Sequence, residues 1–207
     1  THKEIFLREI ISNASDACDK LCYQALTDSA VGMDRGDFKI EITADKDART
    51  LTVSDNGIGM DRADLENNLG IIASSGSYKF KQEVGDDAGE TDVIGQFGVG
   101  FYSAFMVSDQ ITVVTRKHGS ETGYKWQSSG ADGYTISECE KETVGTDIVM
   151  HIKPDTHDEK YSEFLENWRL QELVRKYSDY IRFPIRMEVS KTRKKEDSPE
   201  DKPEYET

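Results

Sequence analysis

The first 26 residues carry two stripes of side chains at helical spacing, and this double pattern limits the possible folds more than any other feature. Both stripes repeat every three or four residues but are offset by two positions, so at about 100° per residue they lie on different faces of one helix. The apolar face holds Leu7, Ile11, Ala14, Cys18 and Leu21. The polar face holds Glu9, Asn13, Asp16 and Lys20. A long helix must therefore be packed on one side, while the other side presents a polar stripe.

Strand-like runs fill most of the remaining chain. The segments 38–45 and 49–55 flank a turn and predict a hairpin, and Asp61 is expected to cap a helix over 61–70. A glycine-rich loop then leads into an apolar helix that begins near residue 101. Further strands are expected at 111–117, 124–130, 133–139, 146–153 and 185–190, with a last helix at 162–180. At the start of the chain, Thr1 and Glu4 fit a capping box.

The composition excludes several classes of partner. Acidic residues outnumber basic ones by 40 to 26, and the net charge of −14 argues against nucleic acid or an anionic membrane as a partner. The apolar runs are far shorter than the roughly 18 to 20 residues of a membrane helix, and the chain opens without a signal-peptide pattern. The three cysteines form no C-x-x-C pair. We therefore expect a chain from a reducing compartment, the cytoplasm.

Residues 55–60, with the sequence D-N-G-I-G-M, come directly after a predicted strand. Alternate glycines allow the backbone to approach a ligand closely, and the Asp55 carboxylate can accept a hydrogen bond from an amino group. The same letters also suit a simple turn that ends a strand. Taken alone, the motif leaves both interpretations open.

A second motif, G-Q-F-G-V-G at 95–100, precedes the apolar run that begins at Phe101. A glycine-rich loop that opens a helix directs free backbone N–H groups at an anion, which is the physical basis of phosphate binding. No Lys-Ser/Thr pair follows, and the glycine spacing differs from the dinucleotide fingerprint. Packing glycines would give the same pattern.

The polar stripe of the first helix is the third candidate. The Asn13 amide oxygen suits a hard cation such as Mg²⁺, and Glu9, one turn away, could take a proton from an attacking water. In isolation, however, such a stripe is more often a solvated helix face.

The order of the three motifs, each in its expected structural context, resembles the nucleotide boxes shared by DNA gyrase, heat-shock chaperones, sensor histidine kinases and MutL. The connecting segments K-E-I-F-L-R-E-I-I-S-N-A-S-D-A-C-D-K-L and V-I-G-Q-F-G-V-G-F-Y-S-A-F-M-V are specifically similar to the amino-terminal ATPase domain of the heat-shock protein 90 family, in its bacterial form. The resemblance covers essentially residues 1–190. It leaves 191–207, with 11 charged residues in 17, as a linker or disordered tail.

This resemblance implies an α/β (α+β) two-layer sandwich, the Bergerat ATP-binding fold, in which helices cover a mixed and largely antiparallel sheet. It implies ATP or ADP with Mg²⁺ as ligands, Glu9 as the general base and Asn13 as the ligand of Mg²⁺. The residues that it assigns to the nucleotide are Asn13, Asp16, Lys20, Asp55, Gly59, Met60, Asn68, Gly95, Gln96, Phe97, Gly98, Val99, Gly100, Phe101 and Thr146.

The family's roles for these residues follow from their positions in the motifs. Asp55 would accept the adenine amino group, with Gly59 and Thr146 completing a water-bridged set around the base. Met60 and Phe101 would line the adenine and ribose. The remaining roles are contact with the ribose or α-phosphate for Asn68, the mouth of the pocket for Asp16 and Lys20, and the phosphate cradle for the backbone of 95–101.

The segment 71–94 corresponds to the lid that closes over nucleotide in this family. The family's usual G-T-I-A-K-S-G-T is here G-I-I-A-S-S-G-S, so Ser74 stands where a lysine is usual. Compared with the family, the 207 residues begin inside the first matching helix and stop where a middle domain would begin. That middle domain supplies an arginine to the γ-phosphate, and such charge compensation can be worth orders of magnitude in rate. We therefore expect nucleotide binding with slow hydrolysis.

The implied biology is a chaperone that uses ATP to fold or activate client proteins. The resemblance implies a homodimer in the full-length form, a monomeric isolated domain, cochaperones as further partners, and inhibition by ansamycins or resorcylic lactones. A sensor histidine kinase and a gyrase- or MutL-type ATPase share the three boxes and remain alternatives. The kinase predicts an acceptor histidine on an upstream helix, and none of the four histidines has that setting. The DNA-dependent enzymes would be expected to bring basic surface from other domains.

Overall fold

The structure is a computed structural model that describes residues 2–70, 100–131, 133–188, 193–194 and 205–206. The α-helices are α1 (Ile5–Ala25), α2 (Arg62–Leu65) and α6 (Asn167–Tyr177). The shorter 3₁₀ and π segments are η1 (His2–Glu4), η2 (Ser29–Val31), η3 (Arg35–Asp37), η4 (Glu66–Gly70), η5 (Gly100–Met106), η6 (Tyr161–Leu165) and η7 (Ser178–Tyr180). The strands are β1 (Ile40–Asp45), β2 (Thr50–Asp55), β3 (Ser108–Arg116), β4 (Gly123–Ser128), β5 (Thr135–Cys139), β6 (Gly145–Ile152), β7 (Ile185–Met187), β8 (Arg193–Lys194) and β9 (Tyr205–Glu206).

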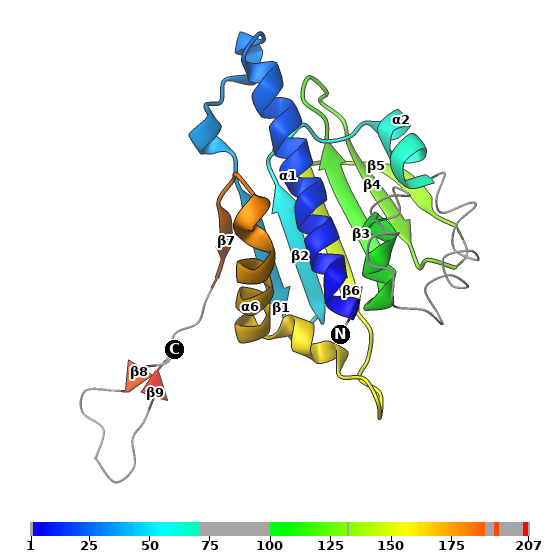
Figure 1. Ribbon diagram of the computed structural model, residues 1–207. Coiled ribbons are helices and arrows are strands. Elements are labelled where there is room, and N and C mark those ends of the chain that lie inside the picture. Colours follow the sequence, from blue (N-terminus) through cyan, green and yellow to red (C-terminus); the bar gives the residue numbers. More distant parts are fainter. Residues whose placement is uncertain (1, 71–99, 132, 189–192, 195–204, 207) are drawn as a thin grey trace.

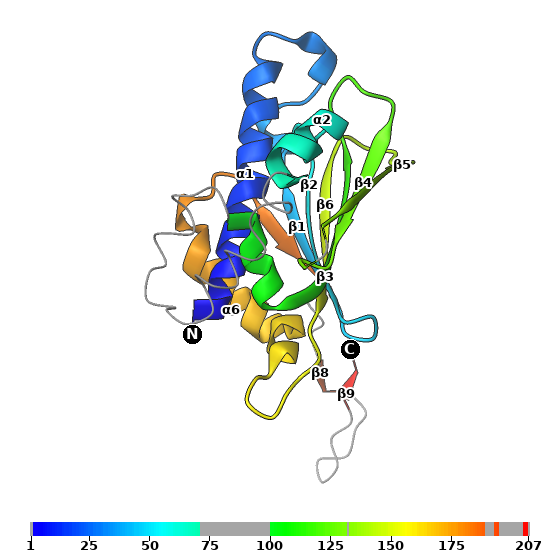
Figure 2. The ribbon, with the colours of Figure 1, turned by 90° about the vertical axis from the view of Figure 1, so that its right-hand side faces the viewer.

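Seven of these strands form one sheet in the order β5-β4-β3-β6-β2-β1-β7. Every neighbouring pair is antiparallel except β1 and β7, which run parallel. The helices α1 and α6 cross the sheet on one face, and the edge-on view places α2 and η5 on that same side (Figures 1 and 2). The predicted two-layer sandwich with a mixed, largely antiparallel sheet is confirmed.

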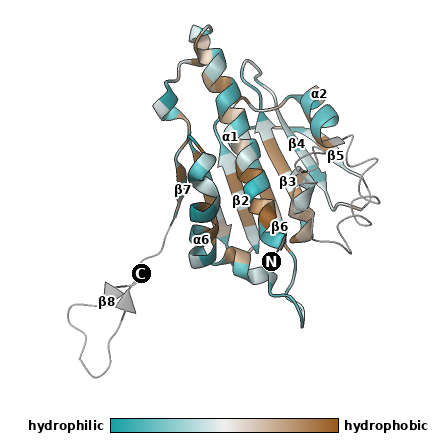
Figure 3. Ribbon diagram, in the orientation of Figure 1, coloured by the Kyte–Doolittle hydropathy of each residue, from teal (hydrophilic) through white to brown (hydrophobic). Residues whose placement is uncertain are grey.

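The predicted hairpin is also confirmed, with Ile40 opposite Asp55 and Asp45 opposite Thr50. Residues on β2 alternate between buried and half-buried, as expected for a strand whose two faces differ. The buried residues Leu51 and Val53 belong to the same core as the apolar face of α1. Brown bands mark the apolar residues along β2 (Figure 3). This packing joins the sheet to α1.

The apolar stripe of α1 lies where the spacing predicted. Its five members are all buried in one core that continues into the sheet. Phe6 adds an edge-to-face contact with Phe164 of η6, with ring centroids 5.1 Å apart. On the opposite face, Asn13, Asp16 and Lys20 are exposed, whereas Glu9, the first member of the polar stripe, is half-buried.

At the start of α1, the Glu4 side chain reaches across to α6. Thr1 lies outside the described residues, and Glu4 makes no capping hydrogen bond. The Glu4 carboxylate instead accepts hydrogen bonds at 2.9 Å from both Arg169 and Tyr177 of α6, and it also pairs with Lys176. This contact joins residues 165 positions apart and gives the half-buried Arg169 guanidinium a charged partner.

Three predicted helices take a different form in the structure. Asp61 caps α2 in a reciprocal arrangement with Asp64, as predicted for Asp61, but α2 has four residues and continues as the π segment η4. The apolar helix expected after the glycine-rich loop is the 3₁₀ segment η5, and the last helix divides into η6, α6 and η7. The predicted tail contributes the short antiparallel pair β8 and β9. The predicted lid at 71–94 lies outside the described residues.

Within the described part of the chain, the structure contains no helix that is both long enough and apolar enough to span a membrane.

Candidate functional site

The carboxyl end of β2 buries an acidic side chain. Asp55 is only 8% exposed, and one of its oxygens accepts a hydrogen bond of 2.9 Å from the Gly57 backbone N–H. Burial raises the pKa of the Asp55 carboxyl to about 7 because the charged form loses its hydration, and the bond from Gly57 opposes this shift. A carboxylate in such a place has capacity for further donors, and perturbed groups of this kind are frequent at functional sites.

Thr146 stands beside Asp55 on the next strand. The two residues are directly paired between β2 and β6, and Thr115 of β3 is paired with Thr146 on the other side. Directly paired residues point to the same face of a sheet, and all three side chains are buried. Three neighbouring strands thus place a row of polar groups under α1.

The loop after Asp55 is fixed to the end of β3. The Met60 N–H donates to the Thr115 hydroxyl at 2.9 Å, and the His118 N–H donates to the Ile58 carbonyl at 2.8 Å. Gly59 has a φ of 70°, and a Cβ there would lie 1.9 Å from the Arg116 carbonyl oxygen. Only glycine fits this position, for its conformation and for its closeness to β3.

A second glycine brings the same loop onto α1. A Cβ on Gly57 would lie 2.3 Å from the Ala17 carbonyl carbon, and the Ile58 N–H donates to the Ala17 carbonyl oxygen at 3.0 Å. The carboxyl-terminal half of α1 is therefore in backbone contact with the loop that carries Gly59 and Met60.

The amino-terminal half of α1 meets the end of the glycine-rich segment. A Cβ on Gly100 would lie 2.3 Å from a carboxylate oxygen of Glu9, so the backbone of η5 passes directly against that side chain. The other Glu9 oxygen accepts a hydrogen bond of 2.9 Å from Arg8. The Glu9 side chain is 14% exposed, and its carboxylate is held between a guanidinium and a backbone turn.

The Asp55 loop and the end of the glycine-rich segment both contact α1, at its two halves. Glu9 and Ala17 are eight positions apart on α1, which corresponds to about 12 Å along the helix axis. Asn13 lies midway between them on the exposed face. A ligand that contacts both ends must be elongated, with one part suited to a buried carboxylate and the other to the Glu9 end.

The other predicted site residues in the described part of the chain differ in their exposure. Asp16 and Lys20 are exposed further along α1, and Asn68 is exposed on η4. Phe101 is buried, with its ring in edge-to-face contact with Trp126 at 5.5 Å between centroids. The predicted residues Gly95, Gln96, Phe97, Gly98 and Val99 lie outside the described residues.

Thr115, the third member of the buried polar row with Asp55 and Thr146, was not identified by the motifs. Its hydroxyl lies 2.8 Å from the Thr146 hydroxyl and 3.2 Å from the Gly145 carbonyl oxygen, in addition to its bond with Met60. The available signal was its position on β3, where it follows Ile111 and Val113 in the inward-facing alternation. A hydroxyl among inward-facing residues needs a partner.

Mg²⁺ is the metal that the family resemblance implies for this site. Among the described residues, no three His, Cys, Asp or Glu side chains form a group able to hold a metal. Mg²⁺ needs only one or two protein ligands when phosphates and water fill the rest of its shell. The exposed amide of Asn13, one helical turn from Glu9, fits such a shared shell.

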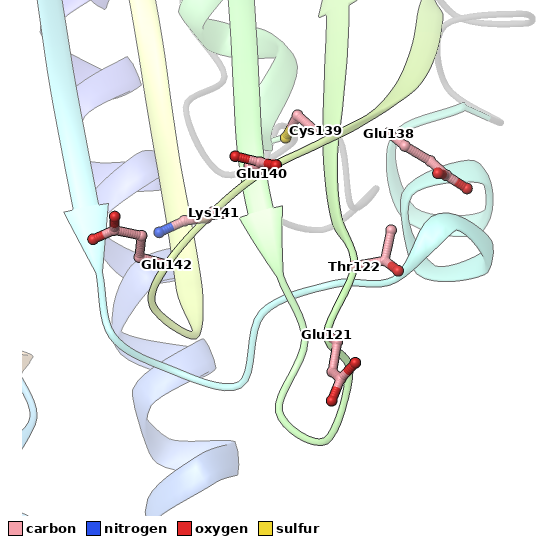
Figure 4. Close-up of a pocket in the computed structure, with 7 residues that line it drawn as sticks. All are labelled: Glu121, Thr122, Glu138, Cys139, Glu140, Lys141 and Glu142. Atoms are coloured by element: carbon pink, nitrogen blue, oxygen red, sulfur yellow. The ribbon is translucent and has the colours of Figure 1, made fainter.

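A separate hollow of about 540 Å³ lies at the β4–β5 end of the sheet (Figure 4). It is lined by Glu121, Thr122, Glu138, Cys139, Glu140, Lys141 and Glu142. Four carboxylates surround a single lysine, so the hollow repels an anionic ligand. Lys141 also lies close enough to Asp55 to oppose, through its charge, the rise in the pKa of that carboxyl.

Comparison with known proteins shows which proteins the chain is similar to. Residues 2–157 match the family model described as histidine kinase-, DNA gyrase B- and HSP90-like ATPase, and residues 163–207 match the model described as Hsp90 protein. The chain is 57% identical over 206 residues to the chaperone protein HtpG of Clostridium acetobutylicum and 56% identical over 198 residues to that of Bacillus subtilis. These alignments cover 99% and 96% of this chain but only 33% and 32% of the relatives, so the chain spans about a third of their length.

The raised pKa of Asp55 makes a prediction about stability. The folded chain binds the proton more tightly than the unfolded chain, whose carboxyl has its ordinary pKa of 3.8. The resulting stability is complete below about pH 4 and is lost as the pH rises through about 7. Asp55→Asn removes this loss. The free energy of unfolding of the variant, minus that of the wild type, should increase by on the order of 1–3 kcal/mol between pH 5 and pH 8 in urea denaturation.

Asp47→Asn is the matched control, because Asp47 is exposed in the turn between β1 and β2. Its difference from the wild type should be the same at both pH values. If the Asp55→Asn difference were also independent of pH, the raised pKa would be wrong.

Proposed function

Because this chain belongs to the family of histidine kinase-, DNA gyrase B- and HSP90-like ATPases, and within it to the Hsp90 family, we propose that it binds and hydrolyses ATP to drive the conformational cycle of a chaperone. The observation that supports this most strongly is the pair of contacts that α1 makes, with the Asp55 loop at Ala17 and with Gly100 at Glu9. One helix thus carries both ends of an elongated site.

The Asp55 end receives the adenine base. The carboxylate accepts the amino group of the base, and Thr146 and Gly59 complete the polar contacts through water. Met60 and Phe101 line the base and the ribose. Asp55 has one oxygen held by Gly57, which leaves the other for the ligand. A donor from the base favours the ionised carboxylate and so offsets part of the penalty of burying it.

The Glu9 end receives the phosphates. Asn13 holds Mg²⁺, which neutralises phosphate charge when it is bound. Backbone N–H groups of 95–101 bind the phosphate oxygens, and Asn68 contacts the ribose or the α-phosphate. Asp16 and Lys20 lie at the mouth of the site.

Glu9 acts as the general base. Its carboxylate takes a proton from the attacking water, and Arg8 and the Gly100 backbone hold it in position. The bond from Arg8 occupies one Glu9 oxygen, so the oxygen beside Gly100 is the one available to the water.

The wider role proposed here concerns a longer protein, of which residues 1–190 form the ATPase domain and 191–207 a linker. Closure of 71–94 over nucleotide completes the site. The partners are client proteins and cochaperones, the assembly is a homodimer, the compartment is the cytoplasm, and ansamycins or resorcylic lactones compete for the base end. The match of 163–207 to the Hsp90 model favours this role over a histidine kinase or a gyrase- or MutL-type enzyme.

The first test is thermal stabilisation by ADP with Mg²⁺. Binding to the folded chain should raise the melting temperature, since a ligand at 100 times its Kd adds about 2.7 kcal/mol to the stability. Asp55→Asn should lose the shift, because the amide replaces one acceptor oxygen with a donor, whereas Asp47→Asn should keep it. A wild type that shows no shift at millimolar ADP would overturn the proposal.

The second test separates binding from chemistry with Glu9→Gln in the full-length protein. The amide keeps the shape of the side chain but cannot take the proton, so ATP hydrolysis should fall by roughly 100-fold or more while the Kd for ADP changes by less than about threefold. Glu66→Gln, an exposed residue of η4, is the control and should leave both unchanged. Loss of ADP binding in Glu9→Gln would instead give Glu9 a structural role.

A further inference from the structure

Thr115 occupies the centre of the polar row. It is fully buried on β3, and β3 is hydrogen-bonded to β6, which is bonded in turn to β2 (Figure 1). Its hydroxyl contacts three groups from two separate segments, namely Met60 in the loop after β2 and both Gly145 and Thr146 of β6. Both segments carry residues of the proposed base end.

The hydrogen bonds of this hydroxyl can be counted. It has one hydrogen and two lone pairs, and the Met60 N–H can only donate, so one lone pair is occupied. The single hydrogen goes either to the Gly145 carbonyl or to Thr146. In the first case Thr146 donates to Thr115 and presents lone pairs to a ligand. In the second, the Thr146 hydrogen is free to be donated. In both cases Thr115 fixes the position of the Thr146 oxygen.

The contact with Met60 has a second consequence. The loop is attached to the end of β3 by backbone contacts at Ile58 and Gly59, which do not depend on a side chain of β3. At Met60 the attachment is made by the Thr115 side chain. Removing this hydroxyl therefore frees Met60 while the rest of the loop remains attached.

We infer that Thr115 is a positioning residue for the base end of the site, and that its hydroxyl sets both the position of the Thr146 oxygen and the position of Met60. This inference rests on the proposed nucleotide site. Thr115 does not touch the base itself in this role, and acts through its two neighbours.

The test measures the Kd for ADP with Mg²⁺ in Thr115→Val and Thr115→Ser. Valine keeps the shape of the side chain and removes the hydroxyl, so the affinity should fall about tenfold or more, because a buried N–H is left without its acceptor and Thr146 loses its partner. Serine keeps the hydroxyl and should stay within about threefold of the wild type. Thr112→Val is the matched control, since Thr112 of the same strand is half-buried and bonds with Gln127.

A double-mutant cycle with Thr146→Val separates positioning from general destabilisation. If Thr115 acts through Thr146, the combined loss of affinity in the double variant should be well below the product of the two single losses. A combined loss equal to that product, or an unchanged Kd in Thr115→Val, would overturn the inference. Should Thr115→Val fail to fold in circular dichroism, Thr115→Cys takes its place, because a thiol is a weak hydrogen-bonding group.

ADP binding by the wild type separates a failure of the proposed function from a failure of the role inferred for Thr115. If it does not bind ADP, the proposed function fails. If it binds ADP and the Thr115 variants bind equally well, only the role of Thr115 fails.

Discussion

The buried carboxyl of Asp55 imposes conditions on every element around it. Its burial disfavours the charged form, so the surroundings must supply hydrogen bonds. The neighbouring backbone must also come close, which leaves no room for a bulky side chain. Gly57 supplies an N–H at 2.9 Å. On the neighbouring strand, a Cβ on Gly145 would lie 2.1 Å from the Asp55 carbonyl oxygen, so glycine is required for β6 to approach β2 at this point. The row formed with Thr146 and Thr115 follows from that approach.

Burying the Asp55 carboxyl is unfavourable, and the packing of the apolar face of α1 on the sheet is a favourable contribution that opposes it. The apolar face of the helix is buried along its length. Gly57 lies against the backbone of α1 at Ala17, and Gly100 lies against the Glu9 side chain, so the two halves of the helix meet the proposed base and phosphate ends. Because α1 is rigid over this distance, the spacing between Glu9 and the Asp55 loop is fixed before any ligand arrives. The helix is therefore a main element of the core, and its length fixes the distance between the two ends that the ligand must span.

Local patterns predicted the fold where local interactions decide it. The two stripes of α1, the hairpin before Asp55 and the cap at Asp61 follow from spacing and turn chemistry. Contacts between distant residues were not predictable in this way. Glu4 bonds across to α6, and Thr115 joins the site through β-sheet pairing that no motif contains. The three boxes were recognised as one site through a resemblance, since their spacing alone does not show that they meet.

The central claim is that nucleotide binds along α1 between the Asp55 loop and Glu9. The most direct measurement is the change in backbone amide NMR shifts of the chain during titration with ADP and Mg²⁺. The account predicts saturable shifts at Gly57, Met60, Thr146 and Gly100, with little change in the acidic hollow at Glu121 and Glu138. Shifts confined to that hollow, or absent from both Met60 and Thr146, would contradict it.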